Sequence, residues 1–98
     1  MSEVSGTLIT IGNHTYEMIE NFREAFDEEQ FKARYSEILH KYDYIVGDIG
    51  YEQLRLRGFF EDSHDKATYD TKISTLPEYI YEYCNFGCPY FVMKKVNP

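Results

Sequence analysis

The 98-residue chain lacks tryptophan, has only two cysteines, and contains no apolar run near the roughly 20 residues needed to cross a bilayer. Its first residues, MSEVSG, also lack the charged-then-apolar pattern of a secretory signal. We therefore expect a cytoplasmic protein that does not enter a membrane. Two cysteines are too few for a disulfide framework, so we expect Cys84 and Cys88 to be reduced thiols.

Positive charge is scarce, because ten Lys and Arg residues face 17 Asp and Glu residues, for a net charge of -7. A protein that binds duplex DNA or an anionic membrane carries a basic surface that replaces counterions, so this composition excludes both classes of partner. The basic residues are concentrated in the middle of the chain. Residues 32–60 hold five of them against four acids, whereas residues 1–31 hold one base against seven acids.

Motifs of catalysis are absent from the sequence. It has no glycine-rich phosphate loop, nucleophile elbow or metalloprotease helix, and the adjacent Ser-His-Asp of residues 63–65 does not have the geometry of a triad. Three residues separate Cys84 from Cys88, which does not match a redox Cys-x-x-Cys loop, and a second close ligand pair is missing. We expect a non-enzymatic protein with no catalytic residue, no metal and no cofactor.

Two hairpins are predicted from alternating apolar and polar residues. The stretch TLITIGNHTYEMIE, residues 7–20, turns at Gly12-Asn13, which places Ile9 opposite Tyr16. The second hairpin covers about 43–49 and 52–60 and turns at Gly50-Tyr51, so that Leu54 and Leu56 face the core. The opposite side of this second hairpin carries polar and aromatic residues, namely Tyr44, Asp48, Arg55, Arg57 and Phe59.

Two helices are predicted from their caps and from apolar spacing. The first covers 27–42, with Asp27 as N-cap and one apolar face made of Phe31, Tyr35, Ile38, Leu39 and Tyr42. The second follows Thr75 as N-cap and stops before Gly87. Between them, residues 61–70 are polar and predict a surface loop, and PYFVMKKV, residues 89–96, predicts a final strand.

The element order β-β-α-β-β-α-β predicts an α+β fold. We expect a mostly antiparallel five-stranded sheet with two helices packed on one face, in a single domain of residues 1–98 whose residues 1–6 are disordered. One core should unite the inward positions of every element: Phe31, Tyr35, Ile38, Leu39, Ile45, Leu54, Leu56, Ile80 and Tyr83.

Two long stretches carry a resemblance to a known family. They are RYSEILHKYDYIVGDIGYEQLRLRGFFED, from Arg34, and DTKISTLPEYIYEYCNFGCPYFVMKK, from Asp70. Together they resemble the YutD-like family of small proteins from Gram-positive bacteria, and the likeness covers nearly all of residues 14–96. The resemblance identifies no catalytic or ligand-binding residue.

The polar face of the second hairpin is the predicted binding site. Tyr44, Asp48, Arg55, Arg57 and Phe59 can contact a protein partner or a phosphate, because guanidinium groups form forked hydrogen bonds with anions. The same residues can equally satisfy one another, since Asp48 lies diagonal to Arg55. Our leading interpretation is a small regulatory protein that docks a protein partner on this face. The alternatives are an RNA-binding module that uses Tyr44, Arg55, Arg57 and Phe59, and a binder of a small anionic metabolite.

Overall fold

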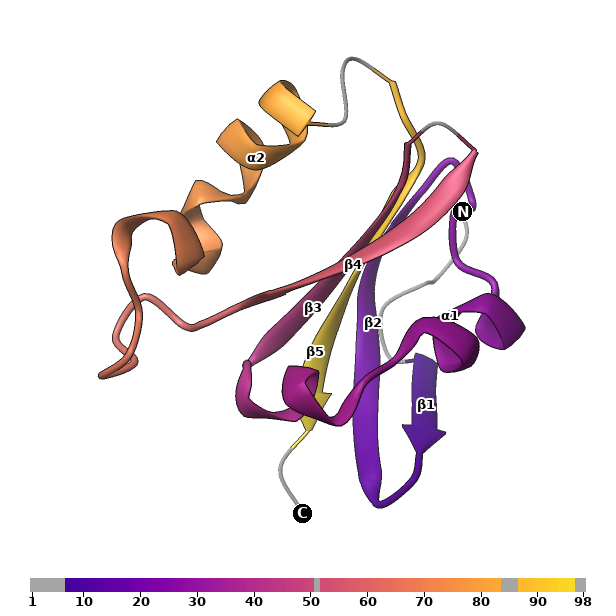
Figure 1. Cartoon of the computed structure of the whole chain (residues 1–98), viewed down its shortest axis with the longest axis horizontal. Helices are drawn as coiled ribbons and strands as arrows, with labels where there is room; N and C mark the ends of the chain where they lie inside the picture. Colours follow the sequence, from indigo (N-terminus) through magenta and orange to yellow (C-terminus); the bar gives the residue numbers. More distant parts are fainter. Residues whose placement is uncertain (1–6, 51, 84–86, 97–98) are drawn as a thin grey trace.

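Strands are the most abundant regular elements in the computed structural model, which describes residues 7–50, 52–83 and 87–96 (Figure 1). The predicted disorder of residues 1–6 lies outside these ranges. The elements run along the chain as β1 (Thr7–Ile11), β2 (His14–Phe22), α1 (Glu28–Arg34), the 3-10 helix η1 (Glu37–Lys41), β3 (Tyr44–Gly50), β4 (Gln53–Phe59), the 3-10 turns η2 (Tyr69–Thr71) and η3 (Ile73–Thr75), α2 (Leu76–Tyr83) and β5 (Tyr90–Val96).

The five strands form one sheet in the order β1-β2-β5-β3-β4, and each pair of neighbours is antiparallel. The last strand in sequence, β5, therefore lies between the two hairpins. This arrangement confirms the α+β class, the order of the elements and the five-stranded antiparallel sheet. The first hairpin has the predicted register, with Ile9 opposite Tyr16 and Gly12 at a φ of 61° in the turn.

The second hairpin has a different turn from the predicted one. Asp48 pairs directly with Arg55 and Gly50 pairs with Gln53, so the register is shifted by two residues. Glu52 adopts a φ of 64°, a conformation that usually selects glycine, so the glutamate did not point to a turn at this position. Because side chains alternate with a period of two, the shift leaves every residue on its predicted face.

The first predicted helix is two shorter elements. Asp27 caps α1 as expected, accepting hydrogen bonds from the amides of Glu29 and Gln30 at 3.0 and 3.3 Å. Tyr35 and Ser36 are extended, and the Ser36 side chain caps η1 by accepting from the amide of Ile38. This local serine cap competes with continuation of the helix.

The interruption changes which residues are buried. Phe31 and Leu39 are buried, whereas Ile38 is 71% exposed, so its predicted burial is wrong. The single α-helical face that the spacing predicted does not exist across the break.

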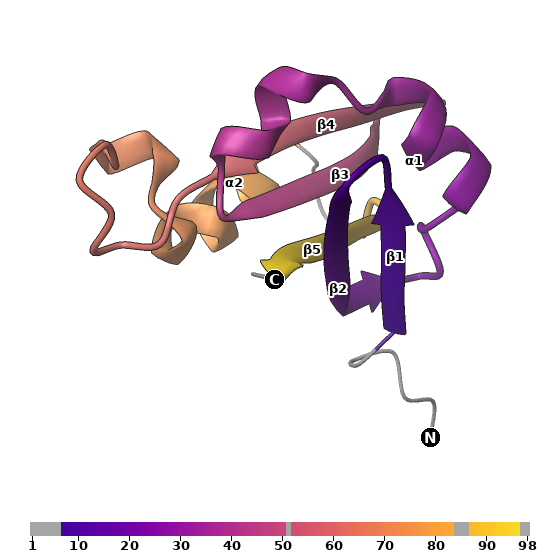
Figure 2. The ribbon, with the colours of Figure 1, turned by 90° about the horizontal axis from the view of Figure 1, so that it is seen from below.

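The two helices pack on opposite faces of the sheet, which corrects the expectation of one shared face (Figure 2). Phe31 of α1 packs in a cluster with Ile45, whereas Leu76 and Tyr79 of α2 pack against Val46. Ile45 and Val46 are consecutive in β3, and consecutive strand residues point to opposite faces. Apolar spacing shows which side of a helix is inward, but not which face of the sheet it covers.

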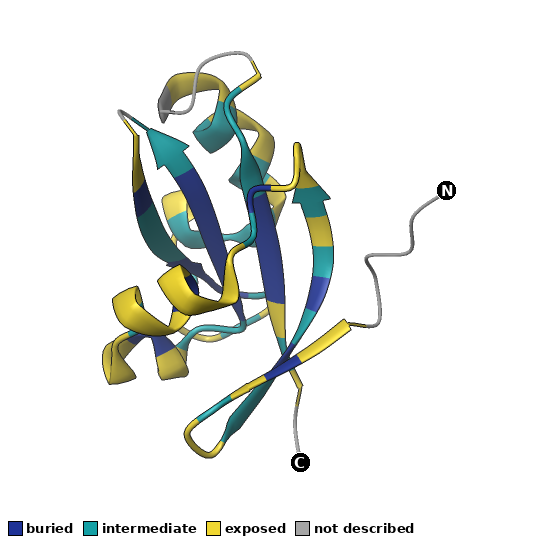
Figure 3. Ribbon diagram, turned by 90° about the vertical axis from the view of Figure 1, so that its right-hand side faces the viewer, coloured by how far each residue is buried: buried dark blue, intermediate teal, exposed yellow. Residues whose placement is uncertain are grey.

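The α1 face holds the larger core. Its buried members come from all five strands and from α1, η1 and the loop before α1: Ile9, Tyr16, Met18, Ala25, Phe31, Leu39, Ile45, Leu54, Phe91 and Met93. Four of these were predicted core residues, and Tyr35 and Leu56 pack at the edge of the cluster. Ile80 is half-buried on the other face, and the side chain of Tyr83 lies outside the described part of the structure. Burial is greatest in β3 and the middle of β5 and decreases toward β1 (Figure 3).

No helix in residues 7–50, 52–83 or 87–96 has both the length and the apolar character required to span a membrane.

Candidate functional site

The five predicted binding residues share one face of the sheet, the face that α2 covers. In the β3–β4 ladder Tyr44 lies opposite Phe59, and Asp48 lies opposite Arg55. The prediction that Arg55 and Arg57 project from the same face as Tyr44 and Asp48 is confirmed, because the side chains of both arginines contact residues of that face.

Asp48 is the centre of this arrangement and is completely buried. Its Oδ1 atom accepts hydrogen bonds from Nε and Nη2 of Arg55 at 2.9 and 2.6 Å, and its Oδ2 atom accepts one from the Tyr79 hydroxyl at 2.8 Å. A buried carboxylate is costly unless donors replace its hydration, and these three donors do so. Burial, followed by the hydrogen bond to Asp48, raises the pKa of Tyr79 to about 12.

Arg57 lies between aromatic rings beside this network. Its guanidinium carbon is 5.2 Å from the ring centroids of both Phe59 and Tyr79, and Nη2 donates to the carbonyl oxygen of Asp70 at 3.0 Å. Its Nε atom is buried and has no hydrogen-bond partner among the described residues. Arg57 therefore connects the sheet to α2 and to the loop that precedes it.

Tyr44 connects the same face to the start of the loop after β4. Its hydroxyl donates to Oε2 of Glu61 at 3.0 Å. Burial is the main cause that raises the pKa of Tyr44 to about 12, and the hydrogen bond to Glu61 adds to it.

These contacts show what the predicted residues do in the folded chain. Tyr44, Asp48 and Phe59 are buried, so no partner reaches them while α2 is in place. Asp48, Arg55 and Tyr79 instead hold α2 against the sheet. The sequence left open whether these residues bind a partner or pair with one another, and Asp48 and Arg55 pair with one another. The Phe59 ring is buried and offers no surface for base stacking.

The same face continues past α2 onto β5 and β2. In the sheet register Asp48 lies opposite Tyr90, and Tyr90 lies opposite Phe22. The Phe22 and Tyr90 rings stack with their centroids 5.4 Å apart. The residues predicted from the hairpin are thus one end of a row that ends at the stacked pair of half-buried Tyr90 and exposed Phe22.

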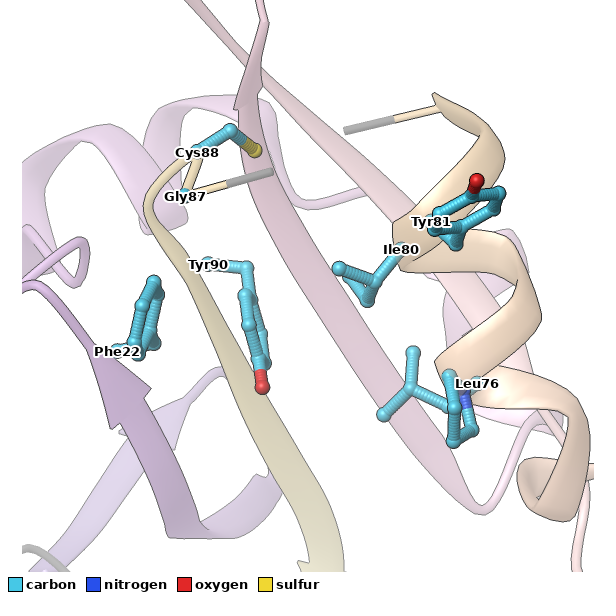
Figure 4. A pocket seen from close by; sticks show the side chains of 8 residues that line it. Phe22, Leu76, Ile80, Tyr81, Gly87, Cys88 and Tyr90 are labelled. Carbon is cyan, nitrogen blue, oxygen red and sulfur yellow. The ribbon is translucent and has the colours of Figure 1, made fainter. Parts of the chain in front are cut away.

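A cavity of about 370 Å³ lies between this pair and α2, and we call it the apolar groove (Figure 4). Its lining consists of Phe22, Leu76, Pro77, Ile80, Tyr81, Gly87, Cys88 and Tyr90. Figure 4 shows Phe22 and Tyr90 on the strand side and Leu76, Ile80 and Tyr81 on the helix side. The groove was not predicted from the sequence. Its prediction requires the strand order and the sheet face that α2 covers, and the aromatic residues alone give neither.

Cys88 lies at one end of the groove and corrects a prediction. Among the described residues no cysteine is free, and Cys88 is disulfide-bonded. The expectation of reduced thiols is therefore wrong for Cys88, while Cys84 lies outside the described residues. That expectation rested on the number of cysteines and on compartment chemistry, neither of which shows whether a given thiol is bonded in the fold.

A second cavity, of about 310 Å³, lies on the other side of α2. It is lined by Arg57, Tyr69, Asp70, Thr75, Glu78, Tyr79 and Glu82. Three carboxyl groups and one guanidinium line it, so its charge does not favour a phosphate or another anionic metabolite.

The three histidines are not close to Cys88. The rings of His14 and His40 stack 3.8 Å apart, and His64 stacks on Phe60. Within the described ranges no three His, Cys, Asp or Glu side chains are grouped as metal ligands would be.

Comparison with known proteins gave three related results. The family model described as "Putative antitoxin YutD-like" matches residues 10–94. The chain is 66% identical over 90 residues to a protein of Bacillus subtilis (strain 168) named "Putative antitoxin YutD", covering 92% of this chain and 99% of that protein. It is also similar to the solution NMR structure of protein YutD from B. subtilis, with a TM-score of 0.81, 61% identity, and coverage of 98% of this chain and 87% of that one.

Proposed function

Because the chain belongs to the YutD-like family, we propose that it is an antitoxin, a small regulatory protein that binds a toxin protein and suppresses the toxin's activity. The name of the Bacillus subtilis relative, "Putative antitoxin YutD", supports this class of function. In this proposal the chain acts by binding and catalyses no reaction, and it works in the cytoplasm, where an intracellular toxin would be found.

The observation that carries the proposal is the apolar groove beside α2. Phe22 is 37% exposed and Tyr81 is 65% exposed, although both are large apolar-bodied side chains. Exposed aromatic residues around a concavity are typical of the centre of a protein interface. The hairpin face predicted to bind a partner leads directly into this groove.

The proposed docking surface is therefore the part of the predicted face that α2 leaves accessible. Arg55 keeps 41% of its side-chain area exposed and can contact a partner at the edge of the interface. Tyr44, Asp48 and Phe59 support the surface from below by holding α2 in place.

The test begins with affinity purification of the tagged chain from cells of a YutD-containing bacterium. Each protein recovered in stoichiometric amount is then expressed alone and together with this chain. We expect one such protein to arrest growth alone and co-expression of this chain to restore growth. Recovery of RNA that is lost at higher salt, with no growth-arresting protein, would contradict the proposal and favour the RNA-binding alternative.

A further inference from the structure

We infer that the Gly87 end of the apolar groove binds the C-terminal residue of the partner protein, with an apolar side chain in the groove and the α-carboxylate on the guanidinium of Arg23. The inference rests on the proposed function for the identity of the partner. It goes beyond that function by naming the part of the partner that docks and the side chain that recognises it.

Arg23 is a cation at this end of the groove, and its side chain is exposed. Its guanidinium carbon is 5.4 Å from the centroid of the Phe22 ring, and a Cβ atom placed on Gly87 would lie 3.4 Å from its Nη2 atom. Phe22 and Gly87 both line the groove. Among the described residues, the Arg23 side chain forms no ion pair and no hydrogen bond. A carboxylate can therefore bind its forked donors without displacing a carboxylate of this chain.

A tight turn after β2 fixes the position of Arg23. Arg23 and Glu24 have consecutive φ values of 59° and 53°, a conformation that a Cβ atom disfavours. Asn21 Oδ1 accepts a hydrogen bond from the amide of Phe26 at 3.0 Å, and Ala25 and Phe26 pack in the larger core. These contacts hold the turn in its costly conformation, so the guanidinium is positioned before any ligand binds.

The two walls of the groove are joined at the same end. One wall is α2, whose last residue is Tyr83, and the other includes β5, which Gly87 and Cys88 precede. Residues 84–86 alone join Tyr83 to Gly87. In Figure 4, Gly87 and Cys88 lie at one end of the groove and Leu76 lies toward the other. A partner chain that enters from the Leu76 end cannot continue between the walls beyond Gly87, because the polypeptide joins them there, whereas a chain terminus can stop beside Arg23.

The groove itself accepts an apolar body. Its volume is about 370 Å³, and its lining in the described part of the chain includes no charged side chain. The strand side offers the stacked Phe22 and Tyr90 rings, and the helix side offers Leu76 and Ile80. A cavity of this size with apolar walls and one polar group at its end is typical of a site for a small ligand or a single anchoring residue.

Two acidic residues limit where an anion can bind. Glu20 is exposed and pairs with Val92 in the β2–β5 ladder, on the side of Tyr90 away from Gly87. Its charge, after burial, is a cause of the raised pKa of Tyr90. Glu24 is exposed beside Arg23 in the turn. Because both residues repel an anion, the carboxylate is favoured only in direct contact with the guanidinium of Arg23.

The first arm of the test titrates the full chain with N-acetyl-glycyl-phenylalanine, used as the free acid and as its C-terminal amide, and follows backbone signals by heteronuclear NMR. We expect the acid to shift the signals of Phe22, Arg23 and Gly87. It should bind at least about fivefold more tightly than the amide, since only the acid offers a charge to Arg23. Equal affinities, or shifts confined to residues outside the groove, would overturn the inference.

The second arm tests the role of Arg23. Arg23→Gln should lower the affinity for the acid to that for the amide and leave the affinity for the amide unchanged. Arg34→Gln is the matched control, because it removes an exposed cation at the end of α1, across the sheet, and should change neither affinity. Equal weakening of both probes by Arg23→Gln would show that Arg23 only supports the shape of the groove, which contradicts the inference. Thermal unfolding of each variant measures any loss of folding.

The third arm uses the growth-arresting protein recovered above. A Gly-Ser extension at its C-terminus should lower its affinity for this chain at least about tenfold, because the carboxylate no longer follows the apolar residue. The same extension at its N-terminus is the control and should have little effect. If the C-terminally extended protein binds and is neutralised like the unmodified one, the inference fails while the antitoxin proposal stands. If no growth-arresting protein is recovered, the proposed function fails, whereas the probe titrations still decide whether the groove recognises a carboxylate.

Discussion

The two faces of the sheet are built in different ways. The α1 face is closed by a continuous set of aromatic and aliphatic side chains, and Tyr16, Phe31 and Phe91 are all fully buried there. The α2 face is closed over one half only, and a charged network centred on Asp48 helps to hold its helix. We therefore expect the first face to supply most of the stability and the second to supply most of the accessible, specific surface.

The physical basis of the difference is the kind of contact each helix makes. Aromatic pairs such as Phe31 and Phe91, with centroids 5.9 Å apart, gain from burial and need no special partner. The contact between Tyr79 and Asp48 requires one geometry, so it fixes the position of α2 while adding less apolar burial. A helix fixed in this way can form one wall of a binding groove without being deeply buried.

The largest expected effect comes from breaking the α1 face. Phe91→Ala should cost about 3–5 kcal/mol in the free energy of unfolding, because it leaves a cavity in the centre of the larger core. Gly47→Ala should also be severe, since a methyl group there would overlap the Phe91 ring. Tyr90→Ala, one residue away on the α2 face, should cost clearly less. Chemical denaturation of the three variants measures this, and equal losses for Phe91 and Tyr90 would contradict the comparison.

The next effect comes from breaking the network under α2. Arg55→Met removes two of the three hydrogen bonds described for the Asp48 carboxylate, and should cost about 1.5–3 kcal/mol, the range for hydrogen bonds to charged groups. Lys32→Met is the control, because it removes a cation whose exposed i,i+4 pair with Glu28 is worth only about 0.3–0.5 kcal/mol. In the Arg55→Met variant, the rate of backbone hydrogen exchange should rise more in α2 than in α1. A uniform rise in both helices would contradict a network specific to α2.

Alkali should weaken both faces, because burial also raises the pKa of Tyr16 on the α1 face, and two of the affected tyrosines belong to the α2 face. Tyr79 and Tyr44 both lie on it, and the pKa of each is raised from 10.0 to about 12 in the folded chain. The unfolded chain therefore loses these protons first, so their contribution to stability is complete below pH 10 and is lost as the pH rises through 12. Melting temperatures between pH 9 and 12 should fall less steeply for Tyr79→Phe than for the wild type. Identical slopes would show that Tyr79 is not coupled to folding.

The smallest effect concerns the β3–β4 turn, which belongs to neither face. Glu52 has a φ of 64°, and glycine takes this conformation without the clash that Cβ creates. Glu52→Gly should raise the stability by up to about 1 kcal/mol, with part of the gain offset by the added freedom of the unfolded chain. Thermal unfolding checks the sign, and a loss of stability would mean that the Glu52 side chain makes a favourable contact in the turn.

Alternation along the strands was the most reliable guide in the sequence. It placed Leu54 and Leu56 toward the core and Arg55 and Arg57 away from it. These assignments are correct although the turn lies one residue later in the chain than predicted. The displacement itself was not predictable, because it places a glutamate where the backbone favours glycine. The same alternation brought Tyr44, Asp48, Arg55, Arg57 and Phe59 together correctly.

The parts that the sequence did not predict depend on contacts distant in the chain. The face chosen by α2 is set by partners such as Asp48, which is 31 residues before Tyr79. The groove required in addition that Phe22 and Tyr90, 68 positions apart, become neighbours through the β2–β5 ladder. The end of α1 depends on a nearby residue, Ser36, whose side chain caps η1. The apolar residues keep helical spacing across Ser36, so the sequence did not indicate this break.

The central position of β5 has a consequence for synthesis on the ribosome. Among the described residues, the N-terminal hairpin and the β3–β4 hairpin share no strand ladder with each other, and β5 joins them by pairing with β2 and β3. Since β5 comprises Tyr90–Val96, both hairpins emerge before the strand that joins them exists. An isolated hairpin is marginally stable in water, so the five-stranded sheet assembles only when β5 has left the ribosome. A chain that ends before β5 would lose the connection between its two hairpins.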